Sequence, residues 1–225
     1  MNTSLSFNLD PNKAKEAGQS QRISETGAYT GHFTQARQVI AQSGSIGIEM
    51  SFESVSGQTA DFLTVYVQGS DGRELAGTKM VHALMTCLKL RSLNSVSGHA
   101  EVFNPASKQR EKQQATIFPD LCGKPVGLVL QVEEYNKSNG GIGESMKLVM
   151  PFDATSKQTA REVLDKLPAE DIENLLHNIK PVIKAKSSGS GHGNASDNQQ
   201  SGSNGGGAAF EDDIPFAQHG RGMIV

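Results

Sequence analysis

Residues 46–67 read IGIEMSFESVSGQTADFLTVYV. Apolar side chains occupy every second position of residues 46–52, which is the pattern of a strand with one buried face. A Ser-Gly turn follows, and residues 62–67 continue as a strand that is apolar or aromatic in both phases. Because only one phase can face the core, either the phase of Leu63 or the phase of Tyr66 must lie on the outside.

Further strands and helices are predicted on both sides of this stretch. In chain order they are a strand at 28–40, an amphipathic helix at 78–93, strands at 126–132 and 146–150, and a helical region at 156–183. Thr78 is the expected N-cap of the first helix, and the polar residues 94–114 are interpreted as a long loop. Five strands with a helix between the third and the fourth form an oligonucleotide-binding (OB) barrel. The predicted fold class is therefore mainly β, a five-stranded OB barrel followed by C-terminal helices.

An abrupt change of composition near Lys186 divides the chain into a folded body and a tail. Residues 1–26 are polar and are expected to form an N-terminal arm, and residues 27–186 are long enough to bury a core without disulfides or metal. Residues 187–209 are rich in Gly, Ser and Asn, which is typical of a disordered, flexible linker. Residues 210–225 begin with an acidic-aromatic peptide, which predicts an interaction tail.

The net charge of −3 is distributed unevenly. Residues 1–186 carry 20 Lys and Arg against 20 Asp and Glu, so the body is neutral and the tail carries all the net charge. A neutral body that binds nucleic acid needs a local basic patch. Residues 79–124 provide a candidate, with seven basic side chains against three acidic ones. The acidic tail could compete with DNA for this patch.

Cysteines, histidines and glycines give no sign of a metal, cofactor or catalytic site. Cys87, Cys122, His82 and His99 lack metal-binding spacing, and residues 140–145 lack the Gly-Lys-Ser/Thr of a phosphate loop. Signatures of a nucleophile or of paired carboxylates are also missing, so we expect no enzyme and no cofactor. Without a secretory signal or an apolar run as long as a membrane span, a soluble protein in the cytoplasm of a bacterial host is expected.

The order of elements and several short motifs resemble a family of phage single-stranded DNA-binding proteins. The motifs are Gly27-Ala28-Tyr29 in the first strand, the Ser-Gly turn before Ile46, Met80-Val81-His82-Ala83-Leu84-Met85 in the helix, and Leu121-Cys122-Gly123-Lys124-Pro125 before the fourth strand. The resemblance covers about residues 27–152. It implies an OB-fold domain that coats single-stranded DNA during phage DNA replication, recombination or repair.

The tail contains a second resemblance. The peptide Asp212-Asp213-Ile214-Pro215-Phe216 is similar to the acidic tip of bacterial single-stranded DNA-binding proteins, which also follows an OB domain and a Gly/Ser/Gln-rich linker. The bacterial proteins end on the phenylalanine, whereas residues 217–225 follow it here. The resemblance implies that Phe210, Glu211 and these five residues bind replication or recombination proteins.

Single-strand binding needs exposed aromatic rings on which bases stack. Tyr66 and Phe62 suit this role because they share the phase opposite Leu63, although Phe62 fits the core equally well. Phe103 stands alone in a polar segment, where it is either a stacking platform or a core anchor. Tyr135 lies at a turn, where its ring could stack at the rim of a binding groove.

Phosphate contacts need a track of cations. The candidates are Arg37, Lys79, Lys89, Arg91, Lys108, Arg110, Lys112, Lys124, Lys137 and Lys147. Residues 108–112 are the densest group, although a charge run in a loop is also typical of a merely solvated surface. Arg37 and Lys137 lie near the loops that border the ligand in OB barrels.

The predicted function is non-catalytic coating of single-stranded DNA with little sequence preference, and recruitment of partners through the tail. Two alternatives stay open. One is an interaction adaptor without intrinsic DNA binding, which the neutral body favours, and the other is a nuclease or another DNA-processing enzyme. The sequence is compatible with a homo-oligomer.

Overall fold

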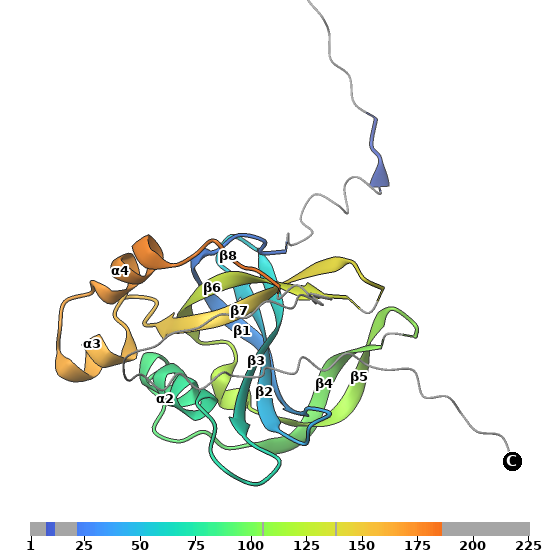
Figure 1. Ribbon diagram of the computed structural model, residues 1–225, viewed down its shortest axis with the longest axis horizontal. Coiled ribbons are helices and arrows are strands. Elements are labelled where there is room, and N and C mark those ends of the chain that lie inside the picture. Colours follow the sequence, from blue (N-terminus) through green and yellow to red (C-terminus); the bar gives the residue numbers. More distant parts are fainter. Residues whose placement is uncertain (1–7, 12–21, 105, 138, 186–225) are drawn as a thin grey trace, which may run out of the picture.

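A long first strand, β1, organises the described part of the chain (Figure 1), which comprises residues 8–11, 22–104, 106–137 and 139–185 of the computed structural model. The elements are β1 (Gly27–Ile40), β2 (Ile46–Ser54), β3 (Thr59–Gln68), α2 (Gly77–Cys87), β4 (Val96–Asn104), β5 (Gln109–Ile117), η1 (Pro119–Leu121), β6 (Pro125–Asn136), β7 (Ile142–Phe152), α3 (Ala160–Asp165), α4 (Asp171–Asn178) and β8 (Val182–Ile183). The fold is mainly β, as the sequence predicts, and each of the five predicted strands is present.

The two halves of β1 pair with different strands. The first half runs antiparallel to β6 and the second half antiparallel to β2. The register shifts between Phe33 and Gln35, and this bulge bends β1 so that it can serve both partners. With β2 pairing β3 and β6 pairing β7, the path runs β3-β2-β1-β6-β7. β3 and β7 contact each other but share no ladder pair, so the sheet of described strands is open.

The core lies between the strands of this path and is covered on one side by α2. Phe33 and Phe52 meet edge to face across β1 and β2, with ring centroids 6.0 Å apart. Leu84 points from α2 into the same cluster and is fully buried. Because α2 contacts both β3 and β7, it spans the place where these two strands do not pair.

The start of α2 differs from its prediction. The helix runs Gly77–Cys87, shorter than the expected 78–93, and Thr78 is not its N-cap. The Thr78 hydroxyl donates instead to the Val67 carbonyl oxygen at 3.1 Å, which ties the helix to β3. A Cβ atom at Gly77 would lie 2.0 Å from the Tyr66 carbonyl oxygen. The helix therefore packs so close to β3 that only glycine fits at this position.

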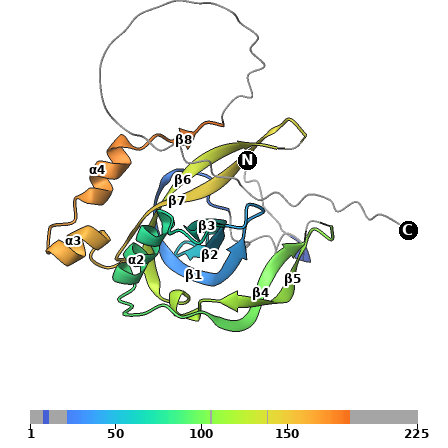
Figure 2. The ribbon, with the colours of Figure 1, turned by 60° about the horizontal axis from the view of Figure 1, so that its bottom comes forward.

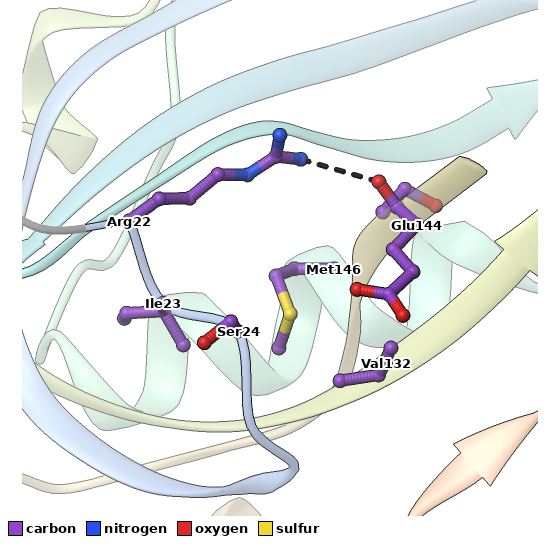
Figure 3. A pocket seen from close by; sticks show the side chains of 7 residues that line it. Arg22, Ile23, Ser24, Val132, Glu144 and Met146 are labelled. Carbon is purple, nitrogen blue, oxygen red and sulfur yellow. Dashed lines mark hydrogen bonds between the residues drawn. The ribbon is translucent and has the colours of Figure 1, made fainter.

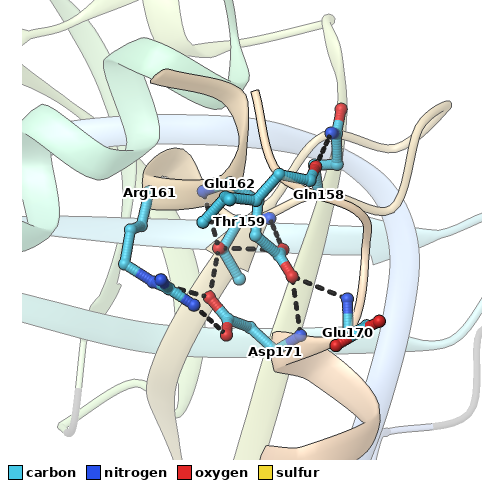
Figure 4. A network of polar contacts seen from close by, with 7 residues as sticks. Gln158, Thr159, Arg161, Glu162, Glu170 and Asp171 are labelled. Carbon is cyan, nitrogen blue, oxygen red and sulfur yellow. Dashed lines mark hydrogen bonds and ion pairs between the residues drawn. The ribbon is translucent and has the colours of Figure 1, made fainter. Parts of the chain in front are cut away.

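The predicted C-terminal helical region consists of α3 and α4, followed by the short strand β8, which pairs with β6 in parallel. The carboxylate of Glu162, whose residue is 1% exposed, joins the two helices (Figure 4). It accepts the backbone N–H groups of Thr159, Glu170 and Asp171 at 2.7, 2.6 and 2.7 Å. Arg161 forms an ion pair with Asp171 beside this network. The network fixes α4 relative to α3, which itself packs on α2.

One prediction about a polar segment is wrong. Residues 94–114, expected as a loop, form most of the β4–β5 hairpin, which pairs from Val96 opposite Ile117 to Asn104 opposite Gln109. The expected N-terminal arm of residues 1–26 joins the body at its end, because Ile23 is 1% exposed and donates its N–H to the Thr59 carbonyl oxygen at 2.8 Å.

Candidate nucleic-acid interface

The outward face of β1, β2 and β3 carries Tyr66. Leu63 and Val65 take the core-facing phase of β3, at 0% and 7% exposure, so Tyr66 lies on the opposite side. Its ring packs over Gly47, the residue opposite it in β2, where a Cβ atom would lie 3.0 Å from the ring. The Tyr66 hydroxyl oxygen is buried. Tyr66 is therefore set into this face and does not project from it.

Phe62 projects from a bulge on the same strand. Ala60 and Leu63 are both buried with two residues between them, and the register with β2 shifts between Met50 and Phe52. Phe62 takes a φ of 61°, which is an unfavourable conformation for a bulky residue. Phe62 is 51% exposed. The sequence left Phe62 either in the core or on the outer face, and in the structure it lies on the outer face.

The β4–β5 hairpin lies beside β1 (Figure 2), and polar contacts anchor it there. The side-chain amide of Gln35 on β1 donates to the Glu101 carbonyl oxygen at 3.0 Å and accepts the Glu101 N–H at 2.6 Å. Arg110 on β5 forms an ion pair with Asp61 on β3, with Nη2 2.5 Å from Oδ2. Phe103, which is 43% exposed, lies directly opposite Arg110 in the hairpin ladder. The hairpin therefore brings Phe103 and a cation to the part of β3 that carries Phe62.

Tyr135 lies on a second hairpin, formed by β6 and β7. Its ring packs over Gly143, its ladder partner, where a Cβ atom would come within 2.4 Å of ring atom Cζ. Both hairpins extend to the same side of the molecule in the two views (Figures 1 and 2). Tyr135 is thus half-buried on a different element from Phe103 and Phe62.

The ten cationic candidates are distributed over several elements. Ion pairs join Arg37 to Glu49, Lys89 to Asp153, and Arg110 to Asp61. The other seven are exposed and comprise Lys79 on α2, Arg91 after it, Lys108 and Lys112 on the β4–β5 hairpin, Lys124 before β6, and Lys137 and Lys147 on the β6–β7 hairpin. The structure places Arg110 opposite Phe103 and pairs it with Asp61, the residue before Phe62. Lys79, Lys89 and Arg91 belong instead to α2 and the segment after it.

Sequence reasoning missed the residues of β1, β3 and β4 whose contacts connect the hairpin to the sheet. Gln35, Asp61 and Glu101 carry no motif, and the contacts join positions 66 and 49 residues apart. The one local feature that pointed to this region was the density of charged residues at 108–112, a group that has Arg110 at its centre.

Two hollows lie away from these residues. A small cavity of about 80 Å³ is lined by Arg22, Ile23, Val132, Glu144 and Met146, among others (Figure 3). It is too small for a nucleotide. A larger groove of about 670 Å³ lies between α2 and the ends of β1, β2 and β3, and much of its lining is aliphatic.

The two thiols of the described ranges are not activated. Burial, helped by the Asp153 carboxylate, raises the pKa of Cys87 to about 12, and burial also raises the pKa of Cys122. Neither thiol is therefore activated as a nucleophile. Within those ranges no group of three His, Cys, Asp or Glu side chains is placed to hold a metal ion. No helix found there combines the length and apolar character needed to cross a membrane.

The linker at 187–209 and the acidic segment Phe210, Glu211, Asp212, Asp213, Ile214, Pro215 and Phe216 lie outside the described residues. No protein-family model matches the chain, and no curated protein matches it.

Proposed function

We propose that this chain binds single-stranded DNA without catalysis and with little sequence preference, through the outer face of β1–β3 and the β4–β5 hairpin. The observation that carries the proposal is the link between two exposed phenylalanines and Arg110. Phe103 lies opposite Arg110 in the hairpin ladder, and Phe62 directly follows Asp61, the ion-pair partner of Arg110. Stacking of one base on an aromatic ring contributes about 1 to 3 kcal/mol, and a nearby cation binds the phosphate between bases.

The strand path supports an OB-type barrel as the framework of this site. In such barrels five strands run in the order β3-β2-β1-β6-β7 of this chain, with a helix after the third. Here the helix in that position, α2, contacts both β3 and β7, which are the two strands that would close the barrel. The β4–β5 hairpin is then an insertion between the helix and the fourth strand of the barrel. The outer face of the second and third strands is the ligand-binding surface in this architecture.

The tail completes the proposal. Residues 210–216 would recruit replication or recombination proteins in the host cytoplasm, after the resemblance of Asp212 to Phe216 to bacterial tail peptides. The linker at 187–209 would keep this peptide accessible while the body occupies DNA.

The test is fluorescence anisotropy of a labelled oligo-dT, titrated at low and moderate salt with the full chain and with a version ending at Lys186. We expect salt-sensitive binding by both, because phosphate contacts release counterions. We expect Phe62→Ala and Phe103→Ala each to weaken binding by about 5- to 150-fold, which corresponds to one lost stack.

Leu164→Ala is the matched control, because Leu164 is a 70% exposed apolar residue on α3, away from the hairpin. If Phe62→Ala and Phe103→Ala behave like Leu164→Ala, this surface is not the binding site. If neither full chain nor truncated version binds the oligonucleotide, an interaction adaptor is the better account, as the neutral charge of residues 1–186 also favours.

A further inference from the structure

One exposed ion pair joins the β4–β5 hairpin to β3. Asp61 and Arg110 are 49 residues apart in the sequence, and their side chains are 28% and 40% exposed. Water reaches both groups, so another anion can replace Asp61 without unpacking the core. Exposed pairs of this kind contribute no more than about 1 kcal/mol to stability. The contact is therefore easily exchanged.

Each residue of this pair has an aromatic neighbour along the strand or across the ladder. Phe62 directly follows Asp61, and Phe103 is the ladder partner of Arg110. A single strand of DNA presents bases and phosphates in alternation. A surface that binds it therefore needs a cation between two aromatic rings on which bases stack. The carboxylate of Asp61 occupies the place on this cation that a phosphate would take.

The other arginine of the outer face is held differently. Arg37 and Glu49 are cross-strand partners on β1 and β2, and their side chains are only 16% and 18% exposed. Arg37 binds one carboxylate oxygen of Glu49 through both Nε, at 2.9 Å, and Nη2, at 2.6 Å. This covered, two-point contact fixes Arg37 within the sheet. Arg110 is the arginine of this face whose partner can be exchanged.

The hairpin does not depend on this ion pair for its position. Gln35 binds both backbone groups of Glu101, and the Phe118 N–H donates to the Ala36 carbonyl oxygen at 2.9 Å just after β5 ends. These contacts tie the edge of β4 and the end of β5 to β1. Opening the Asp61–Arg110 pair therefore frees the Arg110 guanidinium to bind another anion, and the hairpin stays attached to β1.

We propose that Asp61 is an internal substitute for a DNA phosphate, which neutralises Arg110 in the free protein and is displaced when a single strand binds. The inference rests on the proposed function and names a residue that limits affinity. Removing the Asp61 carboxylate leaves the guanidinium ready for a phosphate and removes a like charge from the path of the strand.

Asp61→Asn tests the inference in the full chain, with Asp71→Asn as the matched control. Asp71 pairs with Arg73 at 3.4 Å in the turn after β3 and is 60% exposed, so both variants delete one ion-paired carboxylate. Anisotropy titrations of oligo-dT at several salt concentrations should show Asp61→Asn binding about 3- to 10-fold more tightly than wild type at low salt. Its log–log salt dependence should stay within about 0.7 of the wild-type slope, because Arg110 contacts a phosphate in both complexes. Asp71→Asn should change the affinity less than about twofold.

Arg110 variants separate this inference from a merely structural role. Arg110→Ala should weaken binding, and adding Asp61→Asn to it should then have no further effect, whereas Arg110→Lys should retain part of the affinity. If Asp61→Asn behaves like Asp71→Asn, or tightens binding equally without Arg110, the inference is wrong although DNA binding stands. If wild type and all variants fail to bind oligo-dT, the proposed function and the inference fall together.

Discussion

Replacing Glu162 by Gln changes the side chain by only one group, but it should destabilise the fold substantially. The Glu162 carboxylate is buried and accepts three backbone N–H groups, from Thr159, Glu170 and Asp171, as well as the Thr159 hydroxyl at 3.0 Å. Glutamine keeps the shape but turns one acceptor oxygen into an NH₂ group that faces donors. One oxygen serves Glu170 and Asp171 and the other serves Thr159, so at least one buried donor loses its acceptor in either amide orientation.

The magnitude follows from these contacts. A hydrogen bond to a charged group contributes about 1.5 to 3 kcal/mol, and an unsatisfied buried donor costs about 1 to 3 kcal/mol. We therefore expect Glu162→Gln to lower the free energy of unfolding by about 2 to 4 kcal/mol, measured by urea denaturation followed by circular dichroism. Glu173→Gln, at an exposed position of α4, should change it by less than about 0.5 kcal/mol. Equal losses in the two variants would refute the idea that the buried carboxylate holds α3 and α4 together.

Two further predictions concern stability. Burial opposes the charge of Glu162, but backbone hydrogen bonds from Asp171, Thr159 and Glu170 outweigh it and lower its pKa, and a hydrogen bond from Arg161 lowers the pKa of Asp171. The stabilisation from these two carboxylates is therefore complete above their unfolded pKa values near 4, and it is lost as the pH falls through their folded pKa values. The melting temperature should decrease once the pH is lower than about 4. A melting temperature that stays constant down to pH 2 would contradict this. Gly127→Ala should cost about 1 to 3 kcal/mol in urea denaturation, because its Cβ atom would lie 2.0 Å from the buried Phe152 ring. Gly57→Ala, at a φ of 81° with open space around it, should cost only about 1 kcal/mol, and an equal loss at both positions would exclude the clash at Phe152 as the cause.

Strands with a buried face were predictable from sequence. Residues 46–52 alternate because Ile48, Met50 and Phe52 pack into the core while Glu49 and Ser51 remain half-buried. The apolar pattern of residues 126–132 also marked a strand, although β6 turns out to be buried on both faces there. Burial of one face or both leaves a hydrophobic record in the sequence, and that record was sufficient for all five strands.

The hairpin and the site around it left no such record. Among the described residues of β4 and β5, only Ala100 is buried, so residues 96–117 show the composition of a loop. The pairing of Asp61 with Arg110 depends on the tertiary fold, because the two residues meet only after β5 has crossed back toward β3. Exposed aromatics such as Phe62 could be placed on one of two faces from the strand period, but its bulge and its φ of 61° could not be foreseen.

The polar character that hid the hairpin from sequence reasoning is also what suits it to bind an extended polyanion. An element held to the sheet by apolar packing would have to expose its core before a ligand could take its place. The β4–β5 hairpin is held by the amide of Gln35 and by the Phe118 N–H on the Ala36 carbonyl oxygen, and its phenylalanine, Phe103, is exposed. Exchanging a carboxylate for a phosphate on Arg110 replaces one charge-assisted hydrogen bond by another of similar strength. If this surface binds single-stranded DNA as proposed, the free energy of stacking on Phe62 and Phe103 would then add to an exchange of similar contacts, and a surface with little net charge would suffice.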